Sequence, residues 1–161
     1  MTQTTLIPRK WKYSFDTSAF IDSWRRYYPI DVFQNLWSII AEKIRDHVIV
    51  ATLLVKDEIY VRDDELKEFI KQFPENFIVP DRTTQRYVSE IMNDSDFEGW
   101  RRGKGNQADP FVVGLAKTNN LIVVSYENER NTKNSIPVAC RKLGVEHYTF
   151  IEFLRSENIT L

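Results

Sequence analysis

The chain has 161 residues, of which 42% are hydrophobic and 13% aromatic, and this composition excludes disorder because there is ample apolar surface to bury. Its 22 basic and 23 acidic residues give a net charge of −1, so the overall charge of the chain does not attract nucleic acid. Binding to nucleic acid would need a local patch of basic residues. The single Cys140, the short apolar runs and the lack of an apolar leader exclude an internal disulfide and a membrane span, so we expect one soluble, cytoplasmic domain over residues 1–161.

Short apolar runs alternate with helical patterns along the chain. The expected strands cover residues 13–15, 48–51, 121–124 and 145–150, and residues 77–79 are expected as either a short strand or an extended connector. The expected helices begin near Ser18 and then cover residues 31–46, 53–73 with a break near Asp63, 83–93, 109–119, 136–143 and 151–157. Residues 94–107 mix glycines with basic residues and predict a mobile, basic loop. Strands alternating with helices predict an α/β fold with a parallel sheet covered on both faces.

Four acidic residues stand at comparable points of this pattern: Asp16 follows the first strand, Glu58 lies in the helix after the second, Asp109 opens a helix and Glu127 follows the strand at 121–124. The carboxyl ends of parallel strands lie at one edge of a sheet, so these acids can converge there. Asp57 has apolar neighbours similar to those of Glu58, and periodicity does not choose between the two. Each acid also has an ordinary explanation, since Asp16 and Asp109 suit a helix N-cap, Glu58 suits a surface position and Glu127 suits a solvated turn.

Several carboxylates in one pocket need a cation or raised pKa values. Two of them about 4 Å apart repel by roughly 4 kcal/mol at an effective dielectric of about 20. Oxygen ligands suit Mg²⁺ or Mn²⁺, whereas zinc favours nitrogen and sulfur ligands, and the chain offers only His47, His147 and Cys140 for zinc. The residues therefore predict a site for Mg²⁺ or Mn²⁺.

Four segments in register carry a family resemblance. They are Phe-Asp-Thr-Ser-Ala-Phe-Ile at 15–21, Lys-Asp-Glu-Ile at 56–59, Ala-Asp-Pro at 108–110 and Val-Val-Ser-Tyr-Glu at 123–127. Together they resemble the PIN domain, the superfamily of the VapC-like toxin ribonucleases. Residues 26–29, 33–37 and 136–145 further resemble an uncharacterised bacterial and archaeal branch of PIN-like proteins.

The resemblance implies a three-layer α/β/α sandwich around a mainly parallel sheet. It also implies a metal-dependent endoribonuclease that hydrolyses RNA phosphodiester bonds with Mg²⁺ or Mn²⁺, as the toxin of a toxin–antitoxin pair. The expected partners are then an RNA substrate, a cognate antitoxin protein and a second copy of the chain in a homodimer, with no membrane. The alternative is a catalytically weak PIN-fold module that binds RNA or protein.

The resemblance also assigns roles position by position. The matching catalytic and metal-binding acids are Asp16, Glu58, Asp109 and Glu127, with Thr17 and Ser125 as auxiliary hydroxyls. Asp16 and Asp109 would bind the first ion, and Glu58 would complete that site or orient the attacking water. Glu127 with Ser125 would serve a weaker second ion. Toxin members usually have Asp at the position of Glu127, which puts occupancy of the second site in question.

The basic segment suggests a contact with RNA. Trp100 could stack on a base while Arg101, Arg102 and Lys104 grip phosphates, although a solvated loop is an equal alternative. Further arginines that could extend an RNA track are Arg25, Arg26, Arg82 and Arg86.

Overall fold

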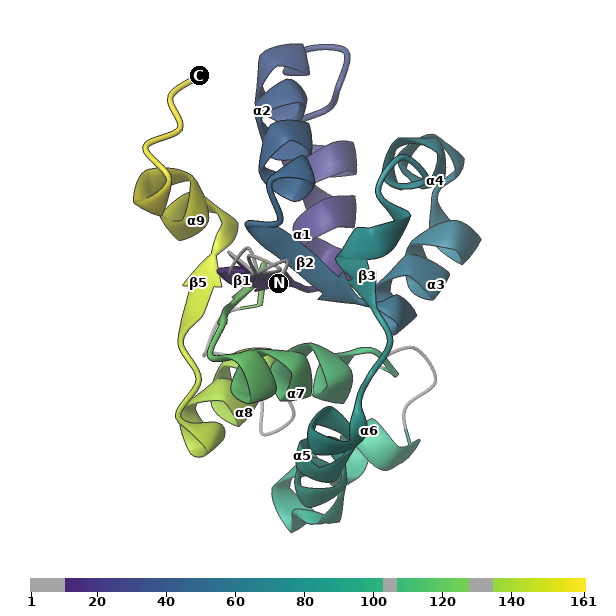
Figure 1. Ribbon diagram of the computed structural model, residues 1–161, viewed down its shortest axis with the longest axis vertical. Coiled ribbons are helices and arrows are strands. Elements are labelled where there is room, and N and C mark those ends of the chain that lie inside the picture. The colour runs from purple at the N-terminus through teal and green to yellow at the C-terminus, as the bar shows by residue number, and fades with distance from the viewer. Residues whose placement is uncertain (1–10, 103–106, 128–134) are drawn as a thin grey trace, which may run out of the picture.

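A computed structural model describes residues 11–102, 107–127 and 135–161, and its described strands form one parallel sheet in the order β3-β2-β1-β4-β5 (Figure 1). The strands are β1 Tyr13–Phe15, β2 Ile49–Thr52, β3 Phe77–Ile78, β4 Ile122–Ser125 and β5 His147–Thr149. The predicted strands are confirmed, with ends that differ by a few residues, and of the two alternatives for residues 77–79 the strand is the one observed. From β1 the chain adds β2 and β3 on one side of the sheet, and it then returns to add β4 and β5 on the other side of β1. The direction in which strands are added therefore reverses between β1 and β4.

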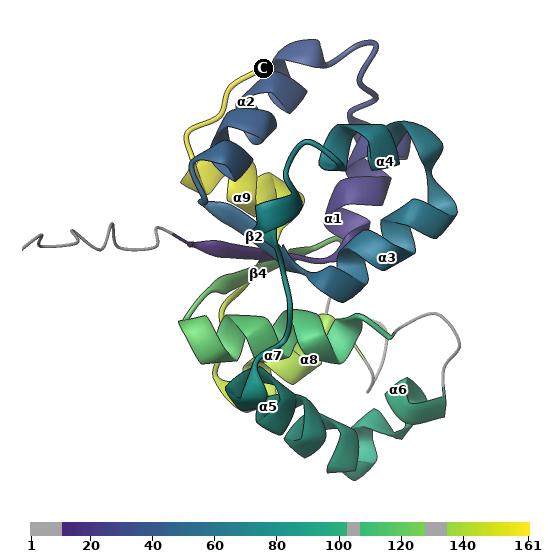
Figure 2. The same cartoon turned by 45° about the vertical axis from the view of Figure 1, so that its right-hand side comes forward.

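Helices cover both faces of the sheet, as predicted. They are α1 Thr17–Asp22, α2 Gln34–Arg45, α3 Leu53–Arg62, α4 Asp64–Ile70, α5 Arg82–Asn93, α6 Glu98–Arg102, α7 Asp109–Asn119, α8 Ile136–Leu143 and α9 Phe150–Ser156. Figure 2 shows α1, α2, α3, α4 and α9 on one side of the sheet and α5, α7 and α8 on the other, which is an α/β/α sandwich. Within the described ranges, no helix has both the length and the apolar character needed to cross a bilayer.

Three details of the helices show where sequence patterns were sufficient and where they were not. The break between α3 and α4 is confirmed at Asp63, whose carboxylate accepts a hydrogen bond from Leu66 N at 3.0 Å. A π-helical turn over Ser23–Tyr27, η1, was not predicted. The segment predicted as a mobile loop is helical in its described part, with a 3₁₀ turn, η3, over Ser95–Phe97 followed by α6, so that prediction is wrong there.

The centre of the sheet is fully buried because helices pack on both sides of it. Every residue of β1 is buried, and Phe15 meets Phe153 of α9 edge to face with ring centroids 5.1 Å apart. On the other face, the hydroxyl of Ser14 donates to the carbonyl oxygen of Val112 in α7 at 3.0 Å. This bond fixes α7 against the central strand and thereby places the first turn of α7 relative to the end of β1.

A half-buried carboxylate ties the C-terminal helix to the start of the sheet. Glu157 accepts hydrogen bonds from Lys12 Nζ at 2.8 Å, Lys43 Nζ at 2.9 Å and the Tyr13 hydroxyl at 2.7 Å. Burial by itself raises the pKa of Glu157, but these donors outweigh it and lower the pKa to about 2. The charged form of Glu157 therefore stabilises the fold.

Glu157→Gln should reduce the free energy of unfolding by about 2 kcal/mol near pH 7, because charge-assisted hydrogen bonds are lost. The folded pKa lies below the unfolded value of 4.5, so this contribution is complete above the unfolded value and disappears as the pH falls toward the folded one. Urea denaturation across this range should show the two proteins converging in acid. Glu68→Gln, at an exposed pair with Lys71, is the control that should leave the midpoint unchanged. A difference for Glu157→Gln that is the same at all these pH values would contradict the account.

Candidate metal centre

Asp16 directly follows β1 and caps α1. Its Oδ2 accepts hydrogen bonds from Ser18 N at 3.2 Å and from the Ser18 hydroxyl at 2.6 Å. The residue is 4% exposed, and its second oxygen, Oδ1, is buried without a hydrogen-bond partner in the described part of the chain. Capping therefore uses one carboxylate oxygen and leaves the other available to a ligand.

Asp109 is the first residue of α7. The expected N-cap role is wrong for it, since Ala108 occupies the N-cap position and Asp109 begins the helix ahead of Pro110. The Asp109 side chain is nonetheless buried, at 7% exposure. A carboxylate in the first turn of a helix lies in the favourable field of the helix dipole, which offsets part of the cost of its burial.

Glu127 follows β4 and is half-buried, so the solvated-turn interpretation does not hold for it. Its Oε2 accepts a hydrogen bond of 2.7 Å from Ile136 N, at the start of α8. Its own N–H donates to the hydroxyl of Ser125 at 3.3 Å, and that hydroxyl also lies 2.7 Å from Nε2 of His147 in β5. Ser125 thus fixes the backbone that carries Glu127.

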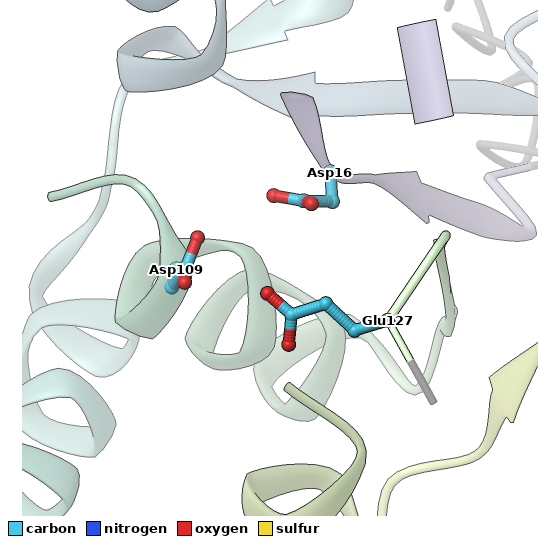
Figure 3. Close-up of side chains that lie close together, drawn as sticks. All are labelled: Asp16, Asp109 and Glu127. Carbon is cyan, nitrogen blue, oxygen red and sulfur yellow. The ribbon is translucent and has the colours of Figure 1, made fainter. Parts of the chain in front are cut away.

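The three acids meet in one space. Asp16, Asp109 and Glu127 each offer one carboxylate oxygen, and these three oxygens lie within 4.8 Å of one another. Figure 3 shows the three side chains, from the end of β1, the start of α7 and the end of β4, pointing toward one another. Because β1 and β4 flank the reversal in strand order, the cluster lies at the switch point where open α/β sheets bind ligands. We call these three residues the acidic cluster.

The members of the acidic cluster destabilise one another's charged forms. Burial first, and then the charges of Asp16, Glu127 and Glu58, raise the pKa of Asp109. Burial, the charge of Glu127 and the charge of Glu58 also raise the pKa of Asp16, against the opposing effect of the Ser18 hydrogen bonds. Burial raises the pKa of Glu127 as well, against the Ile136 N–H bond. Oxygen-only donors and the unpaired Oδ1 of Asp16 fit a hard divalent cation, so the cluster could hold one.

Glu58 lies beside the cluster and is held by other groups. Its Oε2 accepts a 2.5 Å hydrogen bond from the Thr17 hydroxyl, and its Oε1 accepts a 3.3 Å bond from Ala108 N. Asp57 is exposed, so of the two neighbouring acids it is Glu58 that faces the site.

The closest group of three acids differs from the one that the resemblance implied. Asp16 and Asp109 are joined by Glu127, where we expected Glu58. The side chain of Glu127 is one methylene longer than the Asp usual in toxin members, and in Figure 3 it extends toward Asp109. The oxygens of Glu58 are meanwhile engaged by Thr17 and Ala108.

Ser18 is a residue of the site that the sequence interpretation passed over. Its hydroxyl donates to Asp16 and accepts from Tyr126 N at 3.1 Å, so one side chain joins the ends of β1 and β4. The signal was available, because an Asp followed two residues later by a serine is typical of a local side-chain turn at a helix start.

The proposed RNA-binding segment needs one correction. Trp100 is 3% exposed and packs on Phe97 with ring centroids 4.9 Å apart, so its ring belongs to the core and is not free to stack on a base. The side chains of Arg101 and Arg102, and all of Lys104, lie outside the described part of the structure.

Comparison with known families decides where the chain belongs. The model of a family described as "Domain of unknown function (DUF4411)" matches residues 13–161. The chain is a member of this DUF4411 family. Its fold is similar to the crystal structure of FitAcB from Neisseria gonorrhoeae, with a TM-score of 0.53 and 13% identity over 86% of this chain and 98% of that one. No curated protein matches the chain. The similarity supports the PIN-like fold that the sequence predicts for this DUF4411 member.

Asp109→Asn should stabilise the metal-free protein, by about 0.5–2 kcal/mol near neutral pH, as substitutions that relieve a destabilised site commonly do. The pKa of Asp109 is raised above the unfolded value of 3.8, so ionising it costs stability that grows as the pH rises above that value. The stability difference should therefore widen from acid to neutral pH in urea denaturation with EDTA present. Asp57→Asn, at the exposed neighbour of Glu58, is the matched control and should show no such gain. A loss of stability in metal-free Asp109→Asn would contradict the interpretation.

Proposed function

We propose that the protein is a metal-dependent endoribonuclease that hydrolyses RNA phosphodiester bonds with Mg²⁺ or Mn²⁺. The observation that carries the proposal is the acidic cluster itself, in which buried carboxylates from distant parts of the chain face one another and an oxygen of Asp16 has no hydrogen-bond partner among the described residues. The PIN-like fold adds support, since the acids lie at the end of the sheet where this class of fold binds ligands.

Each residue of the site has a distinct task in this proposal. Asp16, Asp109 and Glu127 would hold the ion through carboxylate oxygens, and Ser18 and the Ile136 N–H would keep two of these carboxylates in place. Mg²⁺ or Mn²⁺ would offset most of the negative charge of the three acids, acidify a water and stabilise the charge that builds on the scissile phosphate.

Glu58 would have a different task from the three ligands. It lies close enough to Asp16 and Asp109 to raise the pKa of both, and the hydrogen bonds from Thr17 and Ala108 fix its orientation. A carboxylate held beside an ion site in this way is suited to orient the attacking water by accepting a hydrogen bond from it.

The proposal extends to partners. The basis for this extension is the resemblance of the sequence to the VapC-like toxins of the PIN superfamily. By analogy, we propose that this chain is the toxin of a pair, that its antitoxin covers the acidic pocket, and that two copies of the chain associate.

Millimolar Mn²⁺ should raise the melting temperature of the wild-type protein, because an ion that binds only the folded state adds about 2.7 kcal/mol at 100 times its dissociation constant. Asp16→Asn, Asp109→Asn and Glu127→Gln should each lose this shift and should lose Mn²⁺-dependent cleavage of single-stranded RNA while remaining folded. Differential scanning fluorimetry and a gel-based cleavage assay measure the two effects.

Asp57→Asn serves as the control, since it removes an exposed acid one residue from Glu58 and should retain both the shift and the cleavage. A wild-type protein that shows neither would refute the nuclease and favour the alternative of a PIN-fold binding module. Full cleavage by Asp109→Asn would refute the assignment of the site.

Ser18→Ala should weaken Mn²⁺ binding by about 10- to 100-fold without removing a ligand, as expected when a group that orients a ligating carboxylate is lost. Isothermal titration calorimetry gives the dissociation constant. Ser89→Ala, an exposed serine on α5, is the matched control and should bind as the wild type does. Equal affinity in Ser18→Ala would show that Asp16 does not depend on this hydroxyl.

A further inference from the structure

A stack of three aromatic rings runs from the core to the surface beside the acidic cluster. Phe150 of α9 is 1% exposed and stacks with Tyr126, with ring centroids 5.8 Å apart and ring planes 15° apart. Tyr126 in turn stacks with Tyr27, at 5.0 Å and 10°. We call Phe150, Tyr126 and Tyr27 the ring stack. Its inner end is in the core and its outer end is in solvent.

The outer ring is exposed and firmly placed. Tyr27 is 55% exposed, and in the described part of the chain Tyr126 is the one ring stacked on it. The Tyr126 hydroxyl lies 2.8 Å from the Ser23 hydroxyl, which anchors the middle ring to the same helical turn that carries Tyr27.

That turn is the unpredicted π-helix η1. Tyr28 N donates to the carbonyl oxygen of Ser23, five residues earlier, at 2.7 Å. π-Helical turns are rare and occur frequently at functional sites. Here the turn brings the ring of Tyr27 parallel to that of Tyr126, so the unusual backbone and the ring stack belong to one arrangement.

The ring stack is adjacent to the acidic cluster in the chain and in space. Tyr126 immediately precedes Glu127, and its N–H donates to the Ser18 hydroxyl that holds Asp16. A base stacked on the outer face of Tyr27 would therefore belong to a nucleotide close to any phosphate held at the cluster.

Cationic groups accompany the outer ring. Arg26 has 74% of its side chain exposed, with its Nε 3.8 Å from Asp22, so it can reach an incoming phosphate. Arg25 is instead fixed by a 2.6 Å contact with Asp63. An exposed ring with an exposed arginine at the preceding residue is a combination suited to stacking a base and contacting the backbone of a single strand.

We propose that Tyr27 is a positioning residue, a stacking platform for one unpaired nucleobase of the substrate next to the phosphate that the acidic cluster holds. The inference rests on the proposed nuclease function and deepens it, because it makes the preferred substrate single-stranded at that position. The occupant we assign to this ring is a nucleobase, because the exposed area of one ring suits a base and is far smaller than a stable protein interface.

The test measures binding separately from cleavage. In a Glu58→Gln background, which keeps the three proposed metal ligands and removes the group proposed to orient the water, the affinity for fluorescein-labelled oligo(A) and oligo(U) RNA of about 12 nucleotides is measured by anisotropy with Mn²⁺ present. A duplex of the same length serves for comparison. Tyr27→Ala should weaken single-strand binding by about 5- to 100-fold, and Tyr27→Phe should remain within about twofold, because stacking needs the ring and not the hydroxyl. Tyr87→Ala, a half-buried tyrosine on α5 across the sheet, is the matched control and should bind normally.

A direct signature of stacking completes the test. Oligonucleotides with 2-aminopurine at successive positions should show quenched fluorescence at one position, and Tyr27→Ala should abolish that quenching. Unchanged affinity and quenching in Tyr27→Ala would overturn the inference, and if the wild type still cleaves RNA, the proposed nuclease would stand. A wild type that binds through Tyr27 but does not cleave would support the platform and reject the nuclease. A wild type that neither binds nor cleaves RNA would reject both.

Discussion

Repulsion between buried carboxylates is the interaction on which the rest of this structure depends. Asp16 and Asp109 are both buried, and burial is the largest cause that raises the pKa of each. The charges of Glu127 and Glu58 raise both pKa values further, and the charge of Asp16 also raises the pKa of Asp109. At a separation of about 4 Å, two such charges repel by roughly 4 kcal/mol at an effective dielectric near 20. Protonation of the carboxylates or a bound divalent cation would offset this cost, and the cluster could hold such a cation.

The fold supplies the geometry through the order of its strands. The chain winds away from β1 in opposite directions on its two sides, so the carboxyl ends of the neighbouring strands β1 and β4 lie next to each other. Asp16 follows one of these strand ends and Glu127 follows the other. Ser14 in β1 ties α7 to the sheet, which brings Asp109 to the same place. Ser18 then links the two strand ends. A few hydrogen bonds thus bring the acids at the carboxyl ends of the parallel strands together in the acidic cluster.

The sequence predicted the architecture well because strands buried on both faces read as continuous apolar runs, as at 121–124, and amphipathic helices repeat with their own period. The sequence identified all four acids near the site but not which three form the acidic cluster. The length of the Glu127 side chain and the hydrogen bond that holds Glu58 to Thr17 determine that Glu127, and not Glu58, joins Asp16 and Asp109. The sequence showed no sign of the π-helical turn over Ser23–Tyr27, whose i to i+5 bond depends on tertiary packing. It also misjudged Trp100, because glycines and arginines nearby suggested a loop while Phe97 provides a buried partner for the ring.

The central claim is that a divalent ion binds between Asp16, Asp109 and Glu127. A crystal of the protein soaked in Mn²⁺ and measured near the manganese absorption edge tests it most directly. The account predicts an anomalous peak about 2.0–2.3 Å from a carboxylate oxygen of each of these residues, the range for small divalent ions with oxygen ligands. An empty cluster, with manganese bound only at exposed surface carboxylates, would contradict it.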